Sequence, residues 1–299
     1  MAKAAIHNRI RRSRGEEVFN VFNILFMIFL MLICVYPFWY VIMGSFSRPS
    51  LILGHKGGLL WPLGFSLTAY ETVFANKAIW MGYYNTMIYV VGGTIINIIL
   101  TVMGAYYLSR RFAPCKKFVM ILIMFTMYFS GGMIPGFLNI RNLGLLDTRW
   151  AILLPGAVST FNLIIMRTAF ASIDTSMEES AMLDGAGHWT IMFRIMLPLA
   201  KATIAVLVLY YGVAHWNSWF SAMLYLDNEK LKPLQLVLRE ILIINTDSGA
   251  AGGEDADSEL LSETIKYATI LVATVPILCL YPFLQKYFVK GMMVGAIKG

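Results

Sequence analysis

Charged residues are scarce in this sequence. Asp, Glu, Lys and Arg make up 14% of its 299 residues, whereas soluble domains contain roughly 25%. Hydrophobic residues make up 58%, and the mean hydropathy is +0.67. These values exclude an ordinary soluble domain and indicate an integral membrane protein. The net charge of +7 does not indicate nucleic-acid binding, because the basic residues flank apolar runs and do not gather on one folded surface.

Cysteine is also scarce, with three residues in the chain. Cys34 and Cys279 lie inside apolar runs, and Cys115 lies in a basic turn. This spacing predicts no disulfide framework, and we interpret the three thiols as small apolar side chains.

The sequence contains no G-x-x-x-x-G-K-[ST] loop, so any ATPase that works with it must be a separate chain. Apart from His215, its apolar runs hold no ionisable residue well inside them, and Arg167 lies at the end of one run. Carriers driven by a proton or sodium gradient normally need such residues at membrane depth. A secondary carrier is therefore disfavoured, and we expect a non-catalytic chain with no metal and no cofactor of its own.

Six runs of roughly 20 apolar residues are long enough to cross the hydrocarbon core as helices. We expect an all-α integral membrane protein with six transmembrane helices, preceded by a basic N-terminus at 1–17. The transmembrane domain would cover 18–299, the first run being too long for a signal peptide. The spans lie near 18–46, 85–109, 118–139, 150–170, 200–225 and 265–288.

Lys and Arg are distributed unevenly between the segments that join these spans. If the N-terminus is cytoplasmic, most of the 24 Lys and Arg residues fall in inside segments, and most carboxylates fall outside. The positive-inside rule then places both termini in the cytoplasm. It also places the connection between the fourth and fifth spans there.

That connection is unusually organised for a loop between spans. Thr175 and Ser176 each stand three residues before a carboxylate, Glu178 and Glu179, which is the capping-box spacing. We therefore expect a short helix to begin here, with both acids at the positive end of its dipole.

Gly185 and Gly187 should end this helix and permit a tight reversal, because glycine adopts positive φ without cost. A second, amphipathic helix is expected to follow until Pro198 interrupts it. The residues expected along one side of it are Trp189, Met192, Phe193 and Met196. The pattern over 174–198 thus predicts a cytoplasmic helix-turn-helix.

The same residues resemble a known motif. The loop is similar to the EAA loop of binding-protein-dependent ABC importer permeases. The matching residues are Glu179-Ser180-Ala181, Asp184-Gly185-Ala186, Ile195, Leu197 and Pro198. Ser180 replaces the usual Ala there. The tail 289–299 resembles that of maltose-type carbohydrate permeases, and segments 130–135 and 142–148 resemble the subgroup that imports oligosaccharides and polysaccharide fragments.

The resemblance covers most of 15–299 and implies a function in sugar transport. The chain would be a multi-pass permease subunit in the plasma membrane of a prokaryote, providing half of the translocation pathway of an ATP-driven carbohydrate importer. Its partners would be a second homologous permease, two ATP-binding subunits that hold ATP and Mg, and an extracytoplasmic solute-binding protein. The short helix would dock in a cleft of the ATPase. The implied coupling residues are Glu178, Glu179, Ser180, Ala181, Asp184, Gly185, Ala186, Ile195, Leu197 and Pro198.

A polar and aromatic group in the fifth span suits sugar rings, which stack on aromatic faces and offer hydroxyl groups for hydrogen bonds. The candidate pathway residues are Tyr128, Ser130, Asn162, His215, Trp216, Asn217 and Trp219. Interhelical hydrogen bonds or an interfacial aromatic belt explain them equally well. His215 fits a packing role better than proton transfer, since the spans offer no acidic relay partner.

Other interpretations of the chain remain open. The EAA-like loop alone also fits an ABC permease for another solute, such as an amino acid or polyamine. A membrane scaffold that recruits a cytoplasmic partner without transport, or a helix at 174–198 that rests on lipid, is a further alternative. The acidic stretch 247–257 is either a contact with the binding protein or a solvated linker.

Overall fold

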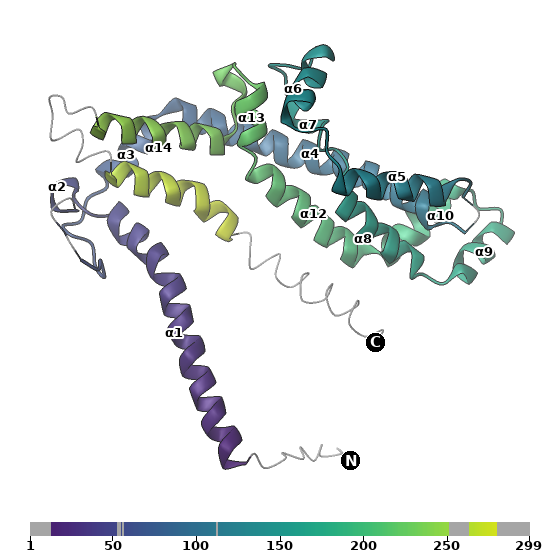
Figure 1. Ribbon diagram of the computed structural model, residues 1–299, viewed down its shortest axis with the longest axis horizontal. Helices are drawn as coiled ribbons and strands as arrows, with labels where there is room; N and C mark the ends of the chain where they lie inside the picture. Colours follow the sequence, from purple (N-terminus) through teal and green to yellow (C-terminus); the bar gives the residue numbers. More distant parts are fainter. Residues whose placement is uncertain (1–12, 53–54, 56, 112, 251–262, 280–299) are drawn as a thin grey trace. The chain divides into compact units, whose positions relative to one another are not determined.

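The computed structural model describes residues 13–52, 55, 57–111, 113–250 and 263–279 (Figure 1). No strand occurs among these residues, in agreement with the expected all-α class, and their one isolated bridge joins Ser47 and Phe65. The chain divides into two compact units, residues 1–70 with 253–271 and residues 71–252 with 272–299. The acidic stretch 247–257 and the end of the sixth expected span lie largely outside the described residues.

The first unit contains α1 (Arg14–Ser45) and α2 (Pro49–Ile52). α1 begins with a capping box, in which Ser13 and Glu16 each bond the other's backbone N–H. Its apolar side chains are exposed along most of its length, which suits a helix surrounded by lipid. At its other end, Gly44 lets the ring of Tyr267 approach closely. A Cβ atom there would lie 2.8 Å from that ring.

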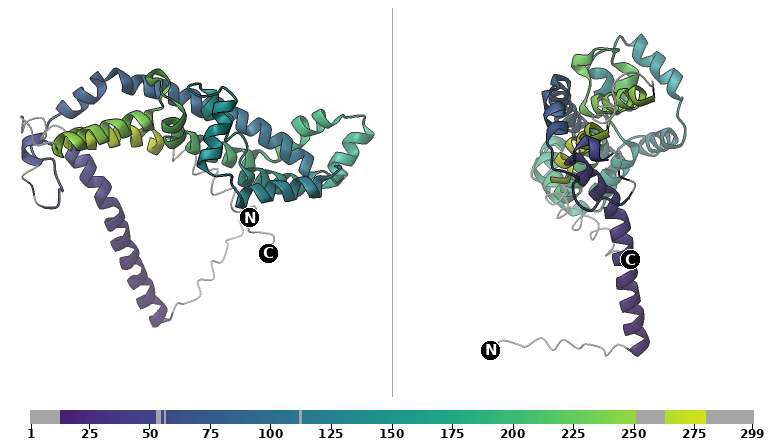
Figure 2. Two further views of the ribbon diagram at one scale, coloured as in Figure 1. Left: turned by 45° about the horizontal axis from the view of Figure 1, so that its top comes forward. Right: turned by 90° about the vertical axis from the view of Figure 1, so that its left-hand side faces the viewer.

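The second unit is built around α4 (Lys77–Ser109), a helix of 33 residues. α8, α12 and α14 pack along it (Figures 1 and 2). α3 (Thr68–Ala75) contains the sequence boundary between the two units. The other helices are α5 (Lys116–Tyr128), α6 (Met133–Asn142), α7 (Trp150–Leu153), α8 (Thr160–Ala171), α9 (Thr175–Leu183), α10 (His188–Ile191), the π-helix η1 (Met192–Met196), α11 (Leu197–Leu199), α12 (Lys201–Trp216), α13 (Phe220–Tyr225), the 3-10 helix η2 (Glu229–Leu231) and α14 (Leu234–Ala250).

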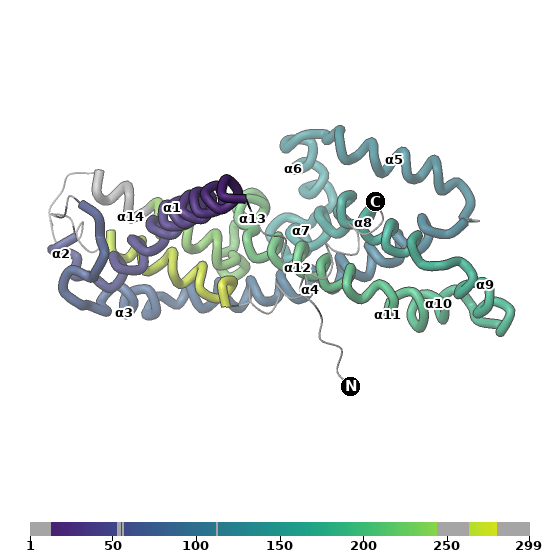
Figure 3. The backbone as a smooth tube through the Cα atoms, turned by 90° about the horizontal axis from the view of Figure 1, so that it is seen from below, coloured from purple at the N-terminus to yellow at the C-terminus, as the bar shows by residue number. Residues whose placement is uncertain are grey.

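Several expected spans are interrupted. α1 and α4 are each long and apolar enough to cross a membrane, α4 beginning well before residue 85. The expected span 118–139 is bent by 116° between α5 and α6 (Figure 3). The span 150–170 is broken between α7 and α8, and 200–225 between α12 and α13. Mean hydropathy over windows of about 20 residues did not reveal these breaks, although they contain helix-breaking or polar residues, among them Gly131, Pro155 and Asn217.

A buried polar stripe on α4 compensates for the break between α7 and α8. Asn97 is fully buried, and its Nδ2 donates to the carbonyl oxygens of Gly156 and Ala157 at 2.8 Å each. Carbonyl groups freed by a helix break have no water to bond at membrane depth, where each unpaired group costs several kcal/mol. The amide of Asn97 therefore makes this irregular backbone tolerable.

Asn85 likewise bonds irregular backbone, about three turns nearer the start of α4. Its Nδ2 donates to the carbonyl oxygens of Lys230 at 2.7 Å and Lys232 at 3.1 Å. Thr86 accepts the N–H of Leu234, the first residue of α14, at 2.9 Å. Both side chains are fully buried, so they hold the connection between α13 and α14 against α4 and do not line a cavity.

Candidate functional site

The loop that begins at Asp174 forms a short helix whose start differs from the prediction. Asp174 is the N-cap of α9, and its side chain accepts the N–H of Ser176 at 2.9 Å. This hydrogen bond lowers the pKa of the Asp174 carboxyl. The expected capping boxes at Thr175 and Ser176 are wrong, because both residues lie inside the helix that the preceding aspartate already caps.

The end of α9 confirms the predicted role of Gly185, which has φ +79°. The N–H of Gly185 bonds the carbonyl of Met182 at 3.0 Å, and the N–H of Ala186 bonds that of Ala181 at 2.9 Å. These two bonds form a Schellman motif, which fixes the direction in which the chain leaves the helix. Gly187 has φ −74° and is the N-cap of α10, so the expectation of a reversal at this second glycine is wrong.

The second half of the loop is not one amphipathic α-helix, because it contains the π-helix η1. Hydrogen bonds from i to i+5 widen the turn, so residues at α-helical spacing no longer share a face. Met192 and Met196 are buried, while Trp189 and Phe193 are exposed and stack on each other with ring centroids 6.0 Å apart. The expectation that all four lie on one side is therefore wrong.

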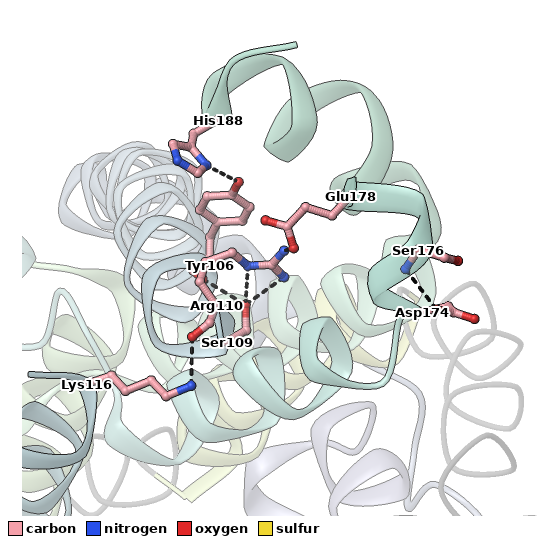
Figure 4. A network of polar contacts seen from close by, with 8 residues as sticks. All are labelled: Tyr106, Ser109, Arg110, Lys116, Asp174, Ser176, Glu178 and His188. Atoms are coloured by element: carbon pink, nitrogen blue, oxygen red, sulfur yellow. Dashed lines mark hydrogen bonds and ion pairs between the residues drawn. The ribbon is translucent and has the colours of Figure 1, made fainter. Parts of the chain in front are cut away.

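α9 presents two different faces, and Figure 4 shows the one on which Glu178 points toward Arg110. Glu178 forms an ion pair with Arg110, the residue that follows the end of α4, and the two side chains are only 15% and 13% exposed. Glu179 and Ser180 are exposed, and Leu183 is 90% exposed. The rotation of the helix thus directs the two adjacent glutamates to different faces. Glu178 is bound within the chain, and Glu179 is accessible to a partner.

Arg110 is held by several neighbouring groups. Its guanidinium lies 4.7 Å from the ring centroid of Tyr106 and donates to the Ser109 hydroxyl at 3.0 and 3.2 Å. The Tyr106 hydroxyl lies 3.1 Å from Nδ1 of His188 on α10, and Lys116 donates to the Arg110 carbonyl at 2.8 Å (Figure 4). The end of α4 therefore contacts both helices of the loop.

A cavity of about 480 Å³ lies between the end of α4 and the loop. Tyr106, Arg110, Glu178, Met182 and Trp189 are among the residues that line it. It separates part of α9 from α4, and the ion pair between Glu178 and Arg110 joins the two helices beside it.

The part of the loop after Gly187 is packed much more firmly. Ile191, Met192 and Met196 belong to a buried core that also contains residues of α4, α8 and α12. Of the candidate coupling residues, Ala181, Ala186, Ile195 and Leu197 pack against this core, whereas Asp184 and Pro198 are exposed.

Pro198 lies two residues before Ala200, where the chain bends by 84° from His188–Leu199 into α12. A displacement of the loop after Gly187 would therefore pass directly to α12 and the core.

The candidate pathway residues do not form one group. His215 Nε2 lies 2.7 Å from the Asn97 Oδ1, at a position where Gly93 leaves room for its ring. Trp216 is 4% exposed and Asn162 is 5% exposed. These contacts agree with the packing interpretation of His215.

Four candidates are exposed: Tyr128 and Ser130 at the turn between α5 and α6, and Asn217 and Trp219 between α12 and α13. In the described part of the chain, no group of three or more His, Cys, Asp or Glu residues could hold a metal ion.

Sequence reasoning missed Arg110, Tyr106 and His188 as parts of this site. Arg110 was counted only as one positive charge at the end of a span. A buried partner for Glu178 could be suspected from the two adjacent glutamates, but its identity depends on how α4 and α9 pack.

Comparisons with known proteins show to which family the chain is similar. The family described as "Binding-protein-dependent transport system inner membrane component" matches residues 78–294. The polygalacturonan/rhamnogalacturonan transport system permease protein YtcP of Bacillus subtilis (strain 168) is 41% identical over 95% of this chain and 99% of its own length. Protein LplC of the same organism is 40% identical over 99% and 100%.

A solved structure has the same fold over nearly the whole chain. It is the crystal structure of a bacterial ABC transporter involved in the import of the acidic polysaccharide alginate. The matched chain has a TM-score of 0.85 and 34% sequence identity, with 93% of this chain and 99% of that chain covered.

Proposed function

Since the chain belongs to the family of binding-protein-dependent transport system inner membrane components, we propose that it is the permease subunit of an ATP-driven importer of acidic oligosaccharides. The observation that carries the proposal is the arrangement of α9. One face is tied to the end of α4 through Arg110, and the other exposes Glu179 and Leu183. A helix with one anchored and one open face is suited to receive a push from a separate subunit.

We propose that Glu179, Ser180 and Leu183 contact an ATPase subunit in the cytoplasm. Glu179 would pair with a basic group there, and the exposed Leu183 would fill an apolar cleft. The push would pass through the Schellman turn at Gly185 to η1 and α11, and then across the 84° bend into α12. The tight turn and the buried methionines of η1 support rigid transmission along this route.

A second route would run through the ion pair into α4. Because α4 bonds the backbone between α7 and α8 and the backbone between α13 and α14, a tilt of α4 would also move the segments around 154–159 and 226–233. The two routes together supply a means by which closure of an ATPase dimer changes the access of the pathway.

The substrate class follows from the relatives. YtcP is named for polygalacturonan and rhamnogalacturonan, polymers that contain a uronic acid, and the matched transporter structure concerns the acidic polysaccharide alginate. We propose that this chain likewise carries oligosaccharides that contain uronate residues, delivered by an extracytoplasmic binding protein.

The complete importer would contain a second, related permease and two ATPase subunits that bind ATP and Mg. Both termini and the loop 174–198 would face the cytoplasm. The contact between Arg110 and Glu178 supports this topology, because it requires the end of α4 and the loop to lie on the same side of the membrane.

Purification of the tagged chain from its native membrane tests the proposal. We expect an ATP-hydrolysing subunit and a second permease to co-purify. Proteoliposomes containing this complex should take up oligogalacturonides only when ATP is inside and the loaded binding protein is outside. Uptake that is driven by an ion gradient without ATP would overturn the proposed function. A reproducible absence of any ATPase from the purified complex would also overturn it, and would favour a membrane scaffold.

A further inference from the structure

Arg239 and Trp219 form a cationic and aromatic pair between α14 and the start of α13. The guanidinium carbon of Arg239 lies 4.5 Å from the centroid of the Trp219 ring. α13 and α14 lie next to each other, so two segments separated in sequence meet here (Figure 1). Trp219 is 36% exposed and Arg239 is half-buried. The pair is therefore accessible and has a fixed arrangement.

The charge of Arg239 is not neutralised within the described part of the chain. Arg239 takes part in none of the ion pairs formed by the described residues, whereas the adjacent Glu240 pairs with Lys232 at 2.8 Å. Among the described residues, its one hydrogen-bond partner is the sulfur of Met223, at 3.3 Å from Nη1. A thioether is a weak acceptor, so a guanidinium with five donors retains most of its capacity for an anion.

The pair lies far from the coupling loop. Trp216, three residues before Trp219, contacts Tyr83 near the start of α4, with ring centroids 6.5 Å apart. Arg110 follows the other end of α4. At about 1.5 Å per residue, roughly 40 Å of helix separates Tyr83 from Arg110. If the loop faces the cytoplasm, the pair lies at the extracytoplasmic end.

We propose that Arg239 and Trp219 form a binding site for a uronate residue at the extracytoplasmic entrance of the pathway. This inference rests on the proposed function, since it assumes an acidic oligosaccharide. The indole ring holds the guanidinium in place by a cation–π contact. The planar guanidinium can then bind both oxygens of one carboxylate through parallel hydrogen bonds. The exposed part of the indole offers an apolar surface for the C–H face of the sugar ring.

The test uses the complete importer in proteoliposomes with trigalacturonate and its fully methyl-esterified form as matched substrates. The ester has the same rings without the charges. Loss of a charge-assisted hydrogen-bond pair should lower uptake of trigalacturonate by about tenfold or more in Arg239→Gln. Uptake of the ester should change much less. Arg239→Lys should retain part of the activity, because it keeps the charge but loses the bidentate geometry.

Arg141→Gln is the matched control, because Arg141 is an exposed arginine on α6 that belongs to none of the ion pairs among described residues. It should transport both substrates normally. ATP hydrolysis stimulated by the loaded binding protein should be measured in parallel to show that each variant complex is assembled and coupled.

The possible outcomes separate this inference from the proposed function. If the unaltered complex takes up neither substrate, the proposed function fails. If it takes up trigalacturonate and Arg239→Gln does so equally well, the uronate site is refuted while the function stands. An equal loss for trigalacturonate and its ester in Arg239→Gln also refutes the site, because it indicates a role in structure or in docking of the binding protein.

Discussion

The ion pair between Arg110 and Glu178 should control how firmly α9 is attached to α4. Glu178→Gln and Arg110→Gln each remove one charge and leave the other charge without its partner. Loss of a hydrogen bond to a charged group costs about 1.5–3 kcal/mol, and loss of one partner of a fully buried pair about 3–5 kcal/mol. Because the side chains are 15% and 13% exposed, we expect the lower range.

Hydrogen–deuterium exchange measures this attachment directly. The amides of α9 exchange when the helix opens locally, and a loss of 1.4 kcal/mol accelerates exchange about tenfold. In the purified, nucleotide-free complex we expect amides of α9 in Glu178→Gln to exchange about ten to a hundred times faster. Arg110→Gln should have a similar effect. The double variant should be no worse than either single variant, because the two residues act through one contact.

Glu179→Gln is the matched control for this experiment. It neutralises the neighbouring carboxylate, which is exposed and has no partner of its own in α4. Exchange in α9 should stay unchanged, while stimulation of the ATPase should fall. Unchanged exchange in Glu178→Gln, or effects of Glu178→Gln and Arg110→Gln that add in the double variant, would refute the attachment.

Further predictions concern packing, backbone conformation and pH. Gly93→Ala places a Cβ atom 2.4 Å from Nε2 of His215 on α12. This overpacking should cost about 1–3 kcal/mol of stability, so the temperature at which the complex unfolds should fall. Gly92→Ala, which meets nothing within 4 Å, should not lower it. Gly185→Val must adopt φ +79°, at a cost of about 1–2 kcal/mol, and should abolish uptake although the protein still inserts. Gly187→Val, at φ −74°, should retain uptake. The lowered pKa of Asp174 means that its capping of α9 is complete above its usual pKa of 3.8 and is lost as pH falls through the lower folded value. Below pH 3.8, hydrogen–deuterium exchange in the first turn of α9 should therefore be faster in the unaltered chain than in Asp174→Asn. The asparagine amide caps the helix at any pH. Equal pH profiles of exchange in the two proteins would contradict this prediction.

The loop 174–198 shows how far local sequence rules reach. The turn at Gly185 was predictable, because a short helix followed by a glycine favours a left-handed cap. The N-cap was misplaced by one residue or more, since Asp174, Thr175 and Ser176 are all good caps and the sequence does not rank them. The π-helix was not predictable, because its residues have the spacing of an ordinary amphipathic α-helix, and the burial of Met192 and Met196 in the core of α4, α8 and α12 is a tertiary contact.

The buried asparagines of α4 are a second example. Asn85 and Asn97 could be recognised as unusual in an apolar helix, but their partners are backbone carbonyl groups far away in sequence. The side-chain amide of an asparagine can bond another helix, bond a loop or line a cavity, and the residue type does not distinguish these roles. Only the packing of α4 against residues 154–159 and 226–233 decides among these.

Composition and the EAA-like spacing were enough to predict an all-α membrane permease with a specialised loop at 174–198. These properties depend on residue counts and short spacings, which the sequence contains directly. The tertiary structure decided which glutamate is bound and which is free, where the spans break, and that Arg239 meets Trp219. Such contacts join segments distant in the chain, and they depend on the orientation of whole helices, to which local sequence patterns are insensitive.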